Sequence, residues 1–308
     1  MIYVALIGQS DRQVEIGTYL ANQDTIVKVT RVIEPNLEEA KRLAQRFGAN
    51  PSDNLDDVLK DSIINLVCVD VPYEDRVRTI EQCAENGKDI LCMGPVASDL
   101  EDTQRILDSV RKNQVRLFSP YPHRNNPHLK MAKEMILKEG RELVSIHFSI
   151  KQKEKQGGAI VNPGATGIDF TRWFTGFDIC QIYCRIVKSN ECEKGVALFG
   201  RLENGTFLSM DAVHSYFDEI VCEALYNDAL LLLTPTNQSV HVDFVDSKMA
   251  GEPNMESLRF SIDEVVRTIE NDSNQTVSYE DIRSVAYLMD QSRLSAKQSK
   301  SIKTALNP

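Results

Sequence analysis

Short apolar runs recur along the first part of the chain and are separated by longer stretches with helical periodicity. Runs of this length between helical segments are typical of buried parallel strands joined by crossover helices. The pattern therefore predicts an α/β domain built on a parallel sheet. The runs are Ile2–Ile7, Val27–Ile33, Ile64–Val69, Asp89–Cys92 and Val115–Phe118.

One intervening stretch carries both a start and a stop signal for a helix. Asn36 precedes an apolar stripe with helical spacing, and Gly48 follows it. An asparagine side chain accepts hydrogen bonds from the first N–H groups of a helix, and glycine readily ends one in the left-handed conformation. The sequence therefore predicts a helix between these two residues.

Beyond Gly140 the pattern changes to strict alternation of apolar and polar residues. Such alternation predicts strands with one buried face, and Asn204-Gly205 predicts a tight hairpin between two of them. We expect a mostly antiparallel sheet in an α+β domain. The alternating sets are Val144, Ile146, Phe148 and Ile150, and Val240, Val242 and Phe244.

The segment SPYPHRNNP, at 119–127, interrupts regular structure with three prolines. Proline at this density marks a connection between structural units. The sequence therefore predicts two domains, at residues 1–122 and 123–308.

The composition of the chain limits the classes of partner that it is expected to bind. The 308 residues carry a net charge of -10, which disfavours non-specific binding to nucleic acid. The chain starts without a basic leader, and none of its apolar runs approaches membrane-spanning length. Seven irregularly spaced cysteines indicate neither a disulfide framework nor a metal site. We expect a cytoplasmic protein that contacts neither nucleic acid nor a membrane.

The turn after the first strand has one feature of a dinucleotide site. Glycines at such a turn allow a pyrophosphate to approach the backbone at a helix N-terminus. The turn GQSDRQ keeps only the first of three usual glycines, and Gln13 stands where helix and strand normally pack closely. A hydroxyl and a guanidinium in the turn could still contact phosphate. The predicted cofactor contacts here are Gly8, Gln9, Ser10 and Arg12.

Glu34 closes the second strand. A carboxylate there would accept hydrogen bonds from the adenine-ribose hydroxyls and repel the 2′-phosphate of NADP, which favours NAD. The alternative is a solvated acid before Pro35. Both interpretations stay open at the level of the sequence.

With these elements in order, the chain resembles the Gfo/Idh/MocA oxidoreductase family along nearly its whole length. The segment at 64–76 is similar to the family's third strand and its threonine-proline-asparagine turn, which here reads Val71-Pro72-Tyr73. GKDILCMGP, at 87–95, resembles the segment ending in Glu-Lys-Pro. GGAIVNPGATGID, at 157–169, resembles an Asp-x-Gly-x-His-x-x-Asp motif, and the segment at 277–303 resembles the closing helix and strand.

The resemblance implies an N-terminal Rossmann dinucleotide-binding domain, an α+β substrate and oligomerisation domain, and a small-molecule ligand in the cleft between them. It also implies a homodimer or homotetramer. Further cofactor contacts would be Val71, Pro72, Met93 and Pro95. The substrate pocket would contain Arg124, Asn162, Thr166 and Asp169.

The same resemblance shows what has changed at the catalytic positions. The family's lysine contacts the nicotinamide ribose and the substrate hydroxyl, and its aspartate and histidine complete the polar cluster. Those positions here hold Gly94, Asn162 and Thr166. Removing a hydroxyl proton needs a base, and amide and hydroxyl side chains do not act as bases near neutral pH.

Three hypotheses follow. The first is a relative with a degenerate active site that binds the nucleotide or a metabolite and serves as a sensor or scaffold. The second is an active NAD(P)-dependent reductase with another proton donor, for which His123 and Tyr121 are the candidates. A surface or hydrogen-bonded loop histidine is the alternative role for His123. The third is a binding module that no longer binds the nucleotide.

Overall fold

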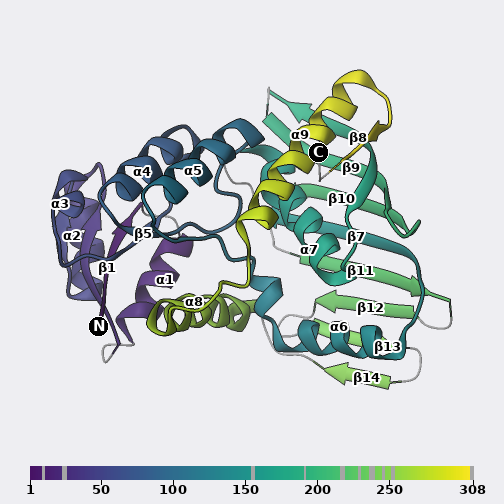
Figure 1. Cartoon of the computed structure of the whole chain (residues 1–308), viewed down its shortest axis with the longest axis horizontal. Coiled ribbons are helices and arrows are strands. Elements are labelled where there is room, and N and C mark those ends of the chain that lie inside the picture. The colour runs from purple at the N-terminus through teal and green to yellow at the C-terminus, as the bar shows by residue number, and fades with distance from the viewer. Residues whose placement is uncertain are drawn as a thin grey trace. The chain divides into compact units, whose positions relative to one another are not determined.

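The structure is a computed structural model that describes residues 1–8, 11–22, 26–153, 157–190, 192–215, 219–227, 230–235, 240–244, 247–250 and 254–305. The chain forms two compact units (Figure 1). The first comprises Met1–Ala97, Glu101–Pro120 and Ile262–Tyr279, and the second comprises Ser98–Leu100, Tyr121–Ser261 and Glu280–Pro308. The single domain boundary at residues 122/123 stays a prediction.

The first unit is built on a parallel sheet with the strand order β3-β2-β1-β4-β5-β6. The predicted α/β class and parallel sheet are confirmed. The apolar run that begins at Ile64 starts earlier than its strand, because burial of Ile64 does not require ladder pairing. The strands are β1 (Ile2–Ile7), β2 (Val27–Ile33), β3 (Asn50–Ser52), β4 (Leu66–Val69), β5 (Asp89–Leu91) and β6 (Leu117–Phe118).

Crossover helices connect these strands. Asn36 accepts hydrogen bonds from the N–H groups of Glu38 and Glu39, and Gly48 ends the same helix at φ 64°. Both predicted helix signals are therefore confirmed. The helices are α1 (Asp11–Ala21), α2 (Leu37–Phe47), α3 (Asp56–Leu59), α4 (Tyr73–Glu85) and α5 (Leu100–Lys112).

A late segment of the sequence returns to the first unit. It contains most of α8 (Asn254–Asn271). The Tyr19 hydroxyl donates to Asp263 at 2.7 Å, and the Leu117 N–H donates to the Tyr279 hydroxyl at 3.2 Å. These side-chain contacts are not visible in local sequence patterns.

The second unit is built on a sheet with the order β14-β13-β12-β11-β7-β10-β9-β8-β15. Among the described strands β7 pairs with β10 in parallel, and the other pairs are antiparallel, as predicted. The hairpin at Asn204-Gly205 is confirmed, with Gly205 at φ 93°. The strands are β7 (Leu143–Lys153), β8 (Ile179–Ser189), β9 (Cys192–Leu202), β10 (Phe207–Ser215), β11 (Glu219–Tyr226), β12 (Leu230–Pro235), β13 (Val240–Phe244), β14 (Ser247–Ala250) and β15 (Ile302–Lys303).

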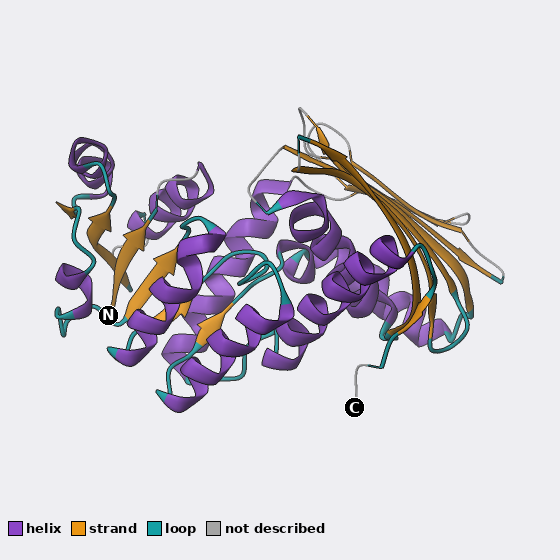
Figure 2. Cartoon of the chain, turned by 90° about the horizontal axis from the view of Figure 1, so that it is seen from above, coloured by secondary structure: helices purple, strands orange, loops and turns teal. Residues whose placement is uncertain are grey.

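Helices cover one face of this sheet and leave the other face open (Figure 2). Ile146, Phe148 and Ile150 alternate along β7 and are buried, as the pattern predicts, whereas Val144 at the start of the strand is 43% exposed. The side chains of Val240, Val242 and Phe244 lie outside the described residues. Within the described residues, no helix combines the length and apolar character that crossing a membrane requires. The helices are the 3₁₀ helix η1 (Pro122–Asn125), α6 (Pro127–Glu139), the π-helix η2 (Ile160–Gly164), α7 (Ala165–Thr175) and α9 (Tyr279–Gln298).

Candidate functional site

The first candidate site lies at the carboxyl edge of the parallel sheet. Strands β1, β2 and β4 end in register, since Ile7 is level with both Ile33 and Val69. The strand order reverses at β1, which is where open α/β sheets bind their ligands. The residues that follow these three strands are Gly8, Glu34 and Asp70.

Gly8 allows the backbone to pass very close to its neighbour at this edge. Its φ is 106°, and a Cβ atom there would lie 2.1 Å from the carbonyl oxygen of Asp70. Its N–H donates to the Ile33 carbonyl at 3.1 Å. A side chain at this position would clash with the backbone, so the surviving glycine has a clear steric role.

The packing of α1 explains how the chain manages without the third glycine of the turn. The Gln13 side chain is buried and its amide nitrogen donates to the Cys68 carbonyl at 2.7 Å, at the end of β4. One turn later, a Cβ at Gly17 would lie 2.6 Å from a Leu6 methyl carbon. The close approach of helix and strand has therefore moved from position 13 to position 17, which sequence reasoning missed.

Glu34 is almost completely buried, with 2% of its surface exposed. Its N–H donates to the Ser52 carbonyl at 3.1 Å, but within the described part of the chain its Oε1 has no hydrogen-bond partner. Burial, together with the charges of Glu39 and Asp70, raises the pKa of Glu34 to about 7. The sequence alternative of a solvated acid does not describe a side chain this buried.

Arg76 holds two turns of this edge together, and no sequence pattern indicated a role for it. Its guanidinium donates to the Val71 carbonyl at 2.9 Å and to the Pro95 carbonyl at 3.0 Å. It also lies 4.1 Å above the Tyr73 ring and 3.7 Å from Asp70. Because both acceptors are backbone atoms, local sequence patterns carry no signal for these contacts.

Gly94 lies between the buried residues Met93 and Pro95. Its φ is 73°, and its carbonyl accepts a hydrogen bond of 2.6 Å from Ser119. No described atom lies within 4 Å of the position where a Cβ would stand. The space beside Gly94 is therefore open, but φ 73° strains any residue that carries a side chain.

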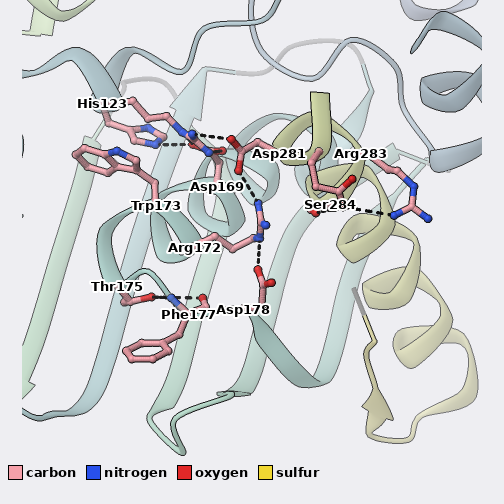
Figure 3. Close-up of polar contacts among 12 residues, drawn as sticks. His123, Asp169, Arg172, Trp173, Thr175, Phe177, Asp178, Asp281, Arg283 and Ser284 are labelled. Carbon is pink, nitrogen blue, oxygen red and sulfur yellow. Dashed lines mark hydrogen bonds and ion pairs between the residues drawn. The ribbon is translucent and has the colours of Figure 1, made fainter. Parts of the chain in front are cut away.

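The second candidate site is a buried cluster of charges in the second unit (Figure 3). Asp169 of α7 is fully buried. It receives hydrogen bonds from Arg124 at 2.6 and 2.9 Å and lies 2.8 Å from the His123 Nε2. These contacts lower the pKa of Asp169 against the opposing effect of burial. The carboxylate is therefore ionised and held by its neighbours.

The cluster continues from Arg124 toward the surface. Arg124 also bonds to Asp281 of α9 at 3.1 Å, and Asp281 bonds to Arg172 at 3.2 Å. Arg172 in turn contacts Asp178 at 2.6 Å (Figure 3). The cluster thus links η1, α7 and α9, which are distant in sequence.

His123 is 8% exposed and is surrounded by aromatic rings. The ring centroids of Tyr121, Phe170 and Trp173 lie 5.7, 5.1 and 5.7 Å from its own. Burial lowers the pKa of His123, although Asp169 opposes this change. The geometry agrees with the hydrogen-bonded loop histidine that was the alternative in the sequence.

Asn162 and Thr166 lie where the π-helix η2 leads into α7. The Asn162 amide donates to the Gly158 carbonyl at 3.4 Å, and the Thr166 hydroxyl donates to the Asn162 carbonyl at 3.2 Å. Both side chains are partly exposed. π-Helical turns occur frequently at functional sites, and the sequence did not predict this one.

The structure thus groups the predicted site residues in two sets. Gly8, Glu34, Val71, Pro72, Met93, Gly94 and Pro95 belong to the first unit, and Tyr121, His123, Arg124, Asn162, Thr166 and Asp169 belong to the second. Gln9, Ser10 and the side chain of Arg12 lie outside the described residues. In the described ranges, His, Cys, Asp and Glu side chains form no group of three suited to hold a metal.

Comparisons with known proteins agree with this organisation. Residues 2–121 match the family described as an oxidoreductase family with an NAD-binding Rossmann fold. The whole fold is similar to levoglucosan dehydrogenase in complex with NADH and levoglucosan, with a TM-score of 0.87 and 17% identity over 98% of this chain and 99% of that one.

Two curated relatives are similar over stretches of sequence longer than the family match at residues 2–121. The dTDP-3,4-didehydro-2,6-dideoxy-alpha-D-glucose 3-reductase of Actinomadura kijaniata is 22% identical over 58% of this chain and 57% of its own. The D-xylose 1-dehydrogenase (NADP(+)) 2 of Haloferax volcanii is 20% identical over 74% of this chain and 72% of its own. The match covers 57% of the length of the Actinomadura kijaniata reductase and only 36% of the length of another curated relative.

The strand order, the glycine at the switch point and the second antiparallel sheet define a two-unit protein with an NAD-binding Rossmann fold. Residues 2–121 match the model of the Gfo/Idh/MocA oxidoreductase family, and this match supports membership of the chain in that family.

Proposed function

We propose that this chain binds NAD(H) in its Rossmann unit and performs little or no ordinary dehydrogenation of hydroxyl groups. The observation that carries the proposal is Gly94: the position that matches the family's lysine has no side chain, and its φ of 73° disfavours one. Such a protein would serve as a metabolite sensor or a scaffold.

The carboxyl edge of the first unit fits a dinucleotide. Gly8 keeps the first turn free of a side chain, as close approach of a pyrophosphate requires. Glu34 has an oxygen with no hydrogen-bond partner among the described residues, and it could accept hydrogen bonds from the ribose hydroxyls. A nicotinamide cofactor would supply the hydride chemistry. The chain's own residues would bind and orient it, through Glu34 and the two turns that Arg76 holds.

The catalytic positions lack a group that exchanges protons near neutral pH. Asn162 and Thr166 offer an amide and a hydroxyl, both of which donate to backbone carbonyls of their own helical segment. A positioned acid or base contributes about 10²–10⁴-fold to the rate, and a lysine ammonium would add stabilisation of an alkoxide. Without either, ordinary turnover is expected to be close to background.

The alternative function is a reductase that uses His123 or Tyr121 as its proton donor. It has less support, because His123 is buried, bonded to Asp169 and held in its neutral form by a lowered pKa. Lys133 is not a free proton donor either. Its ammonium donates to the Trp173 carbonyl and lies 4.9 Å above the Trp173 ring.

Calorimetry with NADH on the ligand-stripped full chain tests the first half of the proposal, and we expect saturable binding. Absorbance of the nicotinamide with a panel of sugars and polyols tests the second half, and we expect no turnover above background. Gly94→Lys combined with Asn162→Asp and Thr166→His is expected to raise turnover.

Two results would contradict this function. Absence of NADH binding would remove the cofactor part. Turnover in the unmodified chain that disappears in His123→Gln or Tyr121→Phe, while NADH binding persists, would establish the alternative.

We propose further that copies of the chain associate through the open face of the second sheet. Phe199 of β9 and Phe207 of β10 are 56% and 62% exposed and are diagonal neighbours across these paired strands, so they form an exposed apolar pair on the sheet. Light scattering on Phe199→Glu and Phe207→Glu tests this proposal. A monomeric mass for the unmodified chain would exclude it.

A further inference from the structure

Glu34 combines deep burial with an unsatisfied oxygen. Buried side-chain oxygens nearly always have a hydrogen-bond partner, yet within the described residues Oε1 of Glu34 has none. Glu34 exposes only 2% of its surface. Because this edge of a Rossmann sheet is where dinucleotides bind, a hydroxyl of a bound ligand could satisfy this acceptor.

The charges around Glu34 oppose its ionisation. Glu39 of α2 and Asp70 beyond β4 both raise its pKa, and burial raises it most, to about 7. Asp70 lies 3.7 Å from Arg76 of α4, and β3 presents the carbonyl of Ser52 to the Glu34 backbone. The positive charge of Arg76 is therefore paired with the neighbouring acid Asp70.

The two protonation states of such a carboxyl recognise different ligands. The carboxylate accepts hydrogen bonds from a ribose 2′-hydroxyl and repels a 2′-phosphate. The neutral acid has an O–H that donates to a phosphate oxygen, and it carries no charge to repel it. One residue can therefore favour either dinucleotide, depending on its proton.

We propose that Glu34 is a proton-dependent selector between NAD(H) and NADP(H): its buried carboxylate favours the 2′-hydroxyl form, and its protonated form admits the 2′-phosphate form. The inference rests on the proposed binding of a dinucleotide and deepens it, because it makes cofactor choice a function of pH. The fixed preference for NAD that the strand-end acid predicts from the sequence would then hold only at alkaline pH, where Glu34 is ionised.

The test measures dissociation constants of NADH and NADPH by nucleotide fluorescence from about pH 5.5 to about pH 8.5, on the ligand-stripped full chain. We expect the preference for NADH over NADPH to fall about tenfold or more as the pH decreases through neutrality, since removing a like charge removes a large penalty. The Glu34→Gln variant, which is neutral throughout, should bind NADPH with little preference against it at every pH.

The 2′-phosphate itself loses charge near pH 6, and the variant corrects for that effect. Glu34→Gln shows the contribution of the phosphate alone, so the difference between the two proteins isolates Glu34. Glu38→Gln, which removes an exposed acid of α2, the helix that follows Glu34, is the matched control and should follow the unmodified chain.

The outcomes separate the two proposals. If both nucleotides bind and their ratio changes with pH equally in the unmodified chain and in Glu34→Gln, the selector is wrong while the cofactor site stands. If neither nucleotide binds at any pH, both proposals are wrong.

Discussion

Each of the two units buries a carboxyl group, and the surroundings shift the pKa of the two groups in opposite directions. Asp169 in the second unit is fully buried, receives hydrogen bonds from Arg124, lies beside His123 and has a lowered pKa. Glu34 in the first unit is almost equally buried, has an unmet oxygen among the described atoms and has a raised pKa. Burial alone therefore does not distinguish a structural acid from a binding acid, whereas the partners do.

This contrast changes the interpretation of the predicted substrate residues. Arg124 and Asp169 are bonded to each other and hold η1 against α7. A pair with these commitments stabilises the fold of the second unit whether or not a ligand approaches it. In the first unit, one oxygen of Glu34 has no hydrogen-bond partner among the described residues, which costs stability and suits a ligand site.

The largest effect is expected for Asp169→Ala. The change leaves the Arg124 guanidinium buried beside fewer negative groups, and breaking a buried ion pair in this way costs about 3–5 kcal/mol. Urea unfolding, followed by the fluorescence of Trp173 in the second unit, measures the loss. Asp178→Ala is the matched control, because Asp178 is partly exposed and should cost less. Equal losses in both variants would show that the buried pair is not special.

Gly8→Ala tests the backbone at the edge of the first unit. Its Cβ would lie 2.1 Å from the Asp70 carbonyl oxygen, and φ 106° is unfavourable for alanine. The strain and the displaced strand end should cost about 2–4 kcal/mol and abolish dinucleotide binding. Gly48→Ala is the control, since a Cβ there meets no described atom. It should be milder and leave binding intact.

The sequence predicted those parts of the fold that depend on periodicity and on turn chemistry. Strands β1 and β2, the capped helix α2 and the hairpin at Gly205 follow from apolar spacing and from single residues with local roles. The return of α8 to the first unit could not be predicted, because it depends on contacts such as that of Tyr19 with Asp263, far apart in sequence.

The candidate site was predictable only as a set of positions. Motif spacing located Gly8, Glu34 and Gly94, but neither the unmet oxygen of Glu34 nor its burial has a sequence signal. Arg76 was missed because its acceptors are main-chain carbonyls, which any sequence supplies. The three-dimensional neighbours of a residue, more than its type, decided its role here.

A third prediction concerns stability rather than binding. The pKa of Glu34 rises from 4.5 to about 7 on folding. As the pH rises from about 4.5 to about 7, the unfolded chain loses this proton first, so stability falls and then stays level above that range. The loss amounts to at most about 3.4 kcal/mol. Glu34→Gln should remove this slope in urea unfolding, and an unchanged slope would contradict the raised pKa.

The smallest effect arises from His123, and its dependence on pH is the opposite of that of Glu34. Burial lowers the pKa of His123 below its usual 6.5, so the unfolded chain takes up the proton first as the pH falls. The contribution to stability is therefore complete above about pH 6.5 and is lost progressively as the pH falls through the lower, folded pKa. His123→Gln keeps an N–H that can reach Asp169 but cannot titrate, and it should flatten the slope below pH 6.5 while leaving the Glu34 slope in place. NMR titration of the imidazole, assigned by its absence in His123→Gln, measures the pKa directly. A midpoint above 6.5 would mean that the pull of Asp169 outweighs burial, and the second unit would then hold an imidazolium that the alternative reductase could use as its acid.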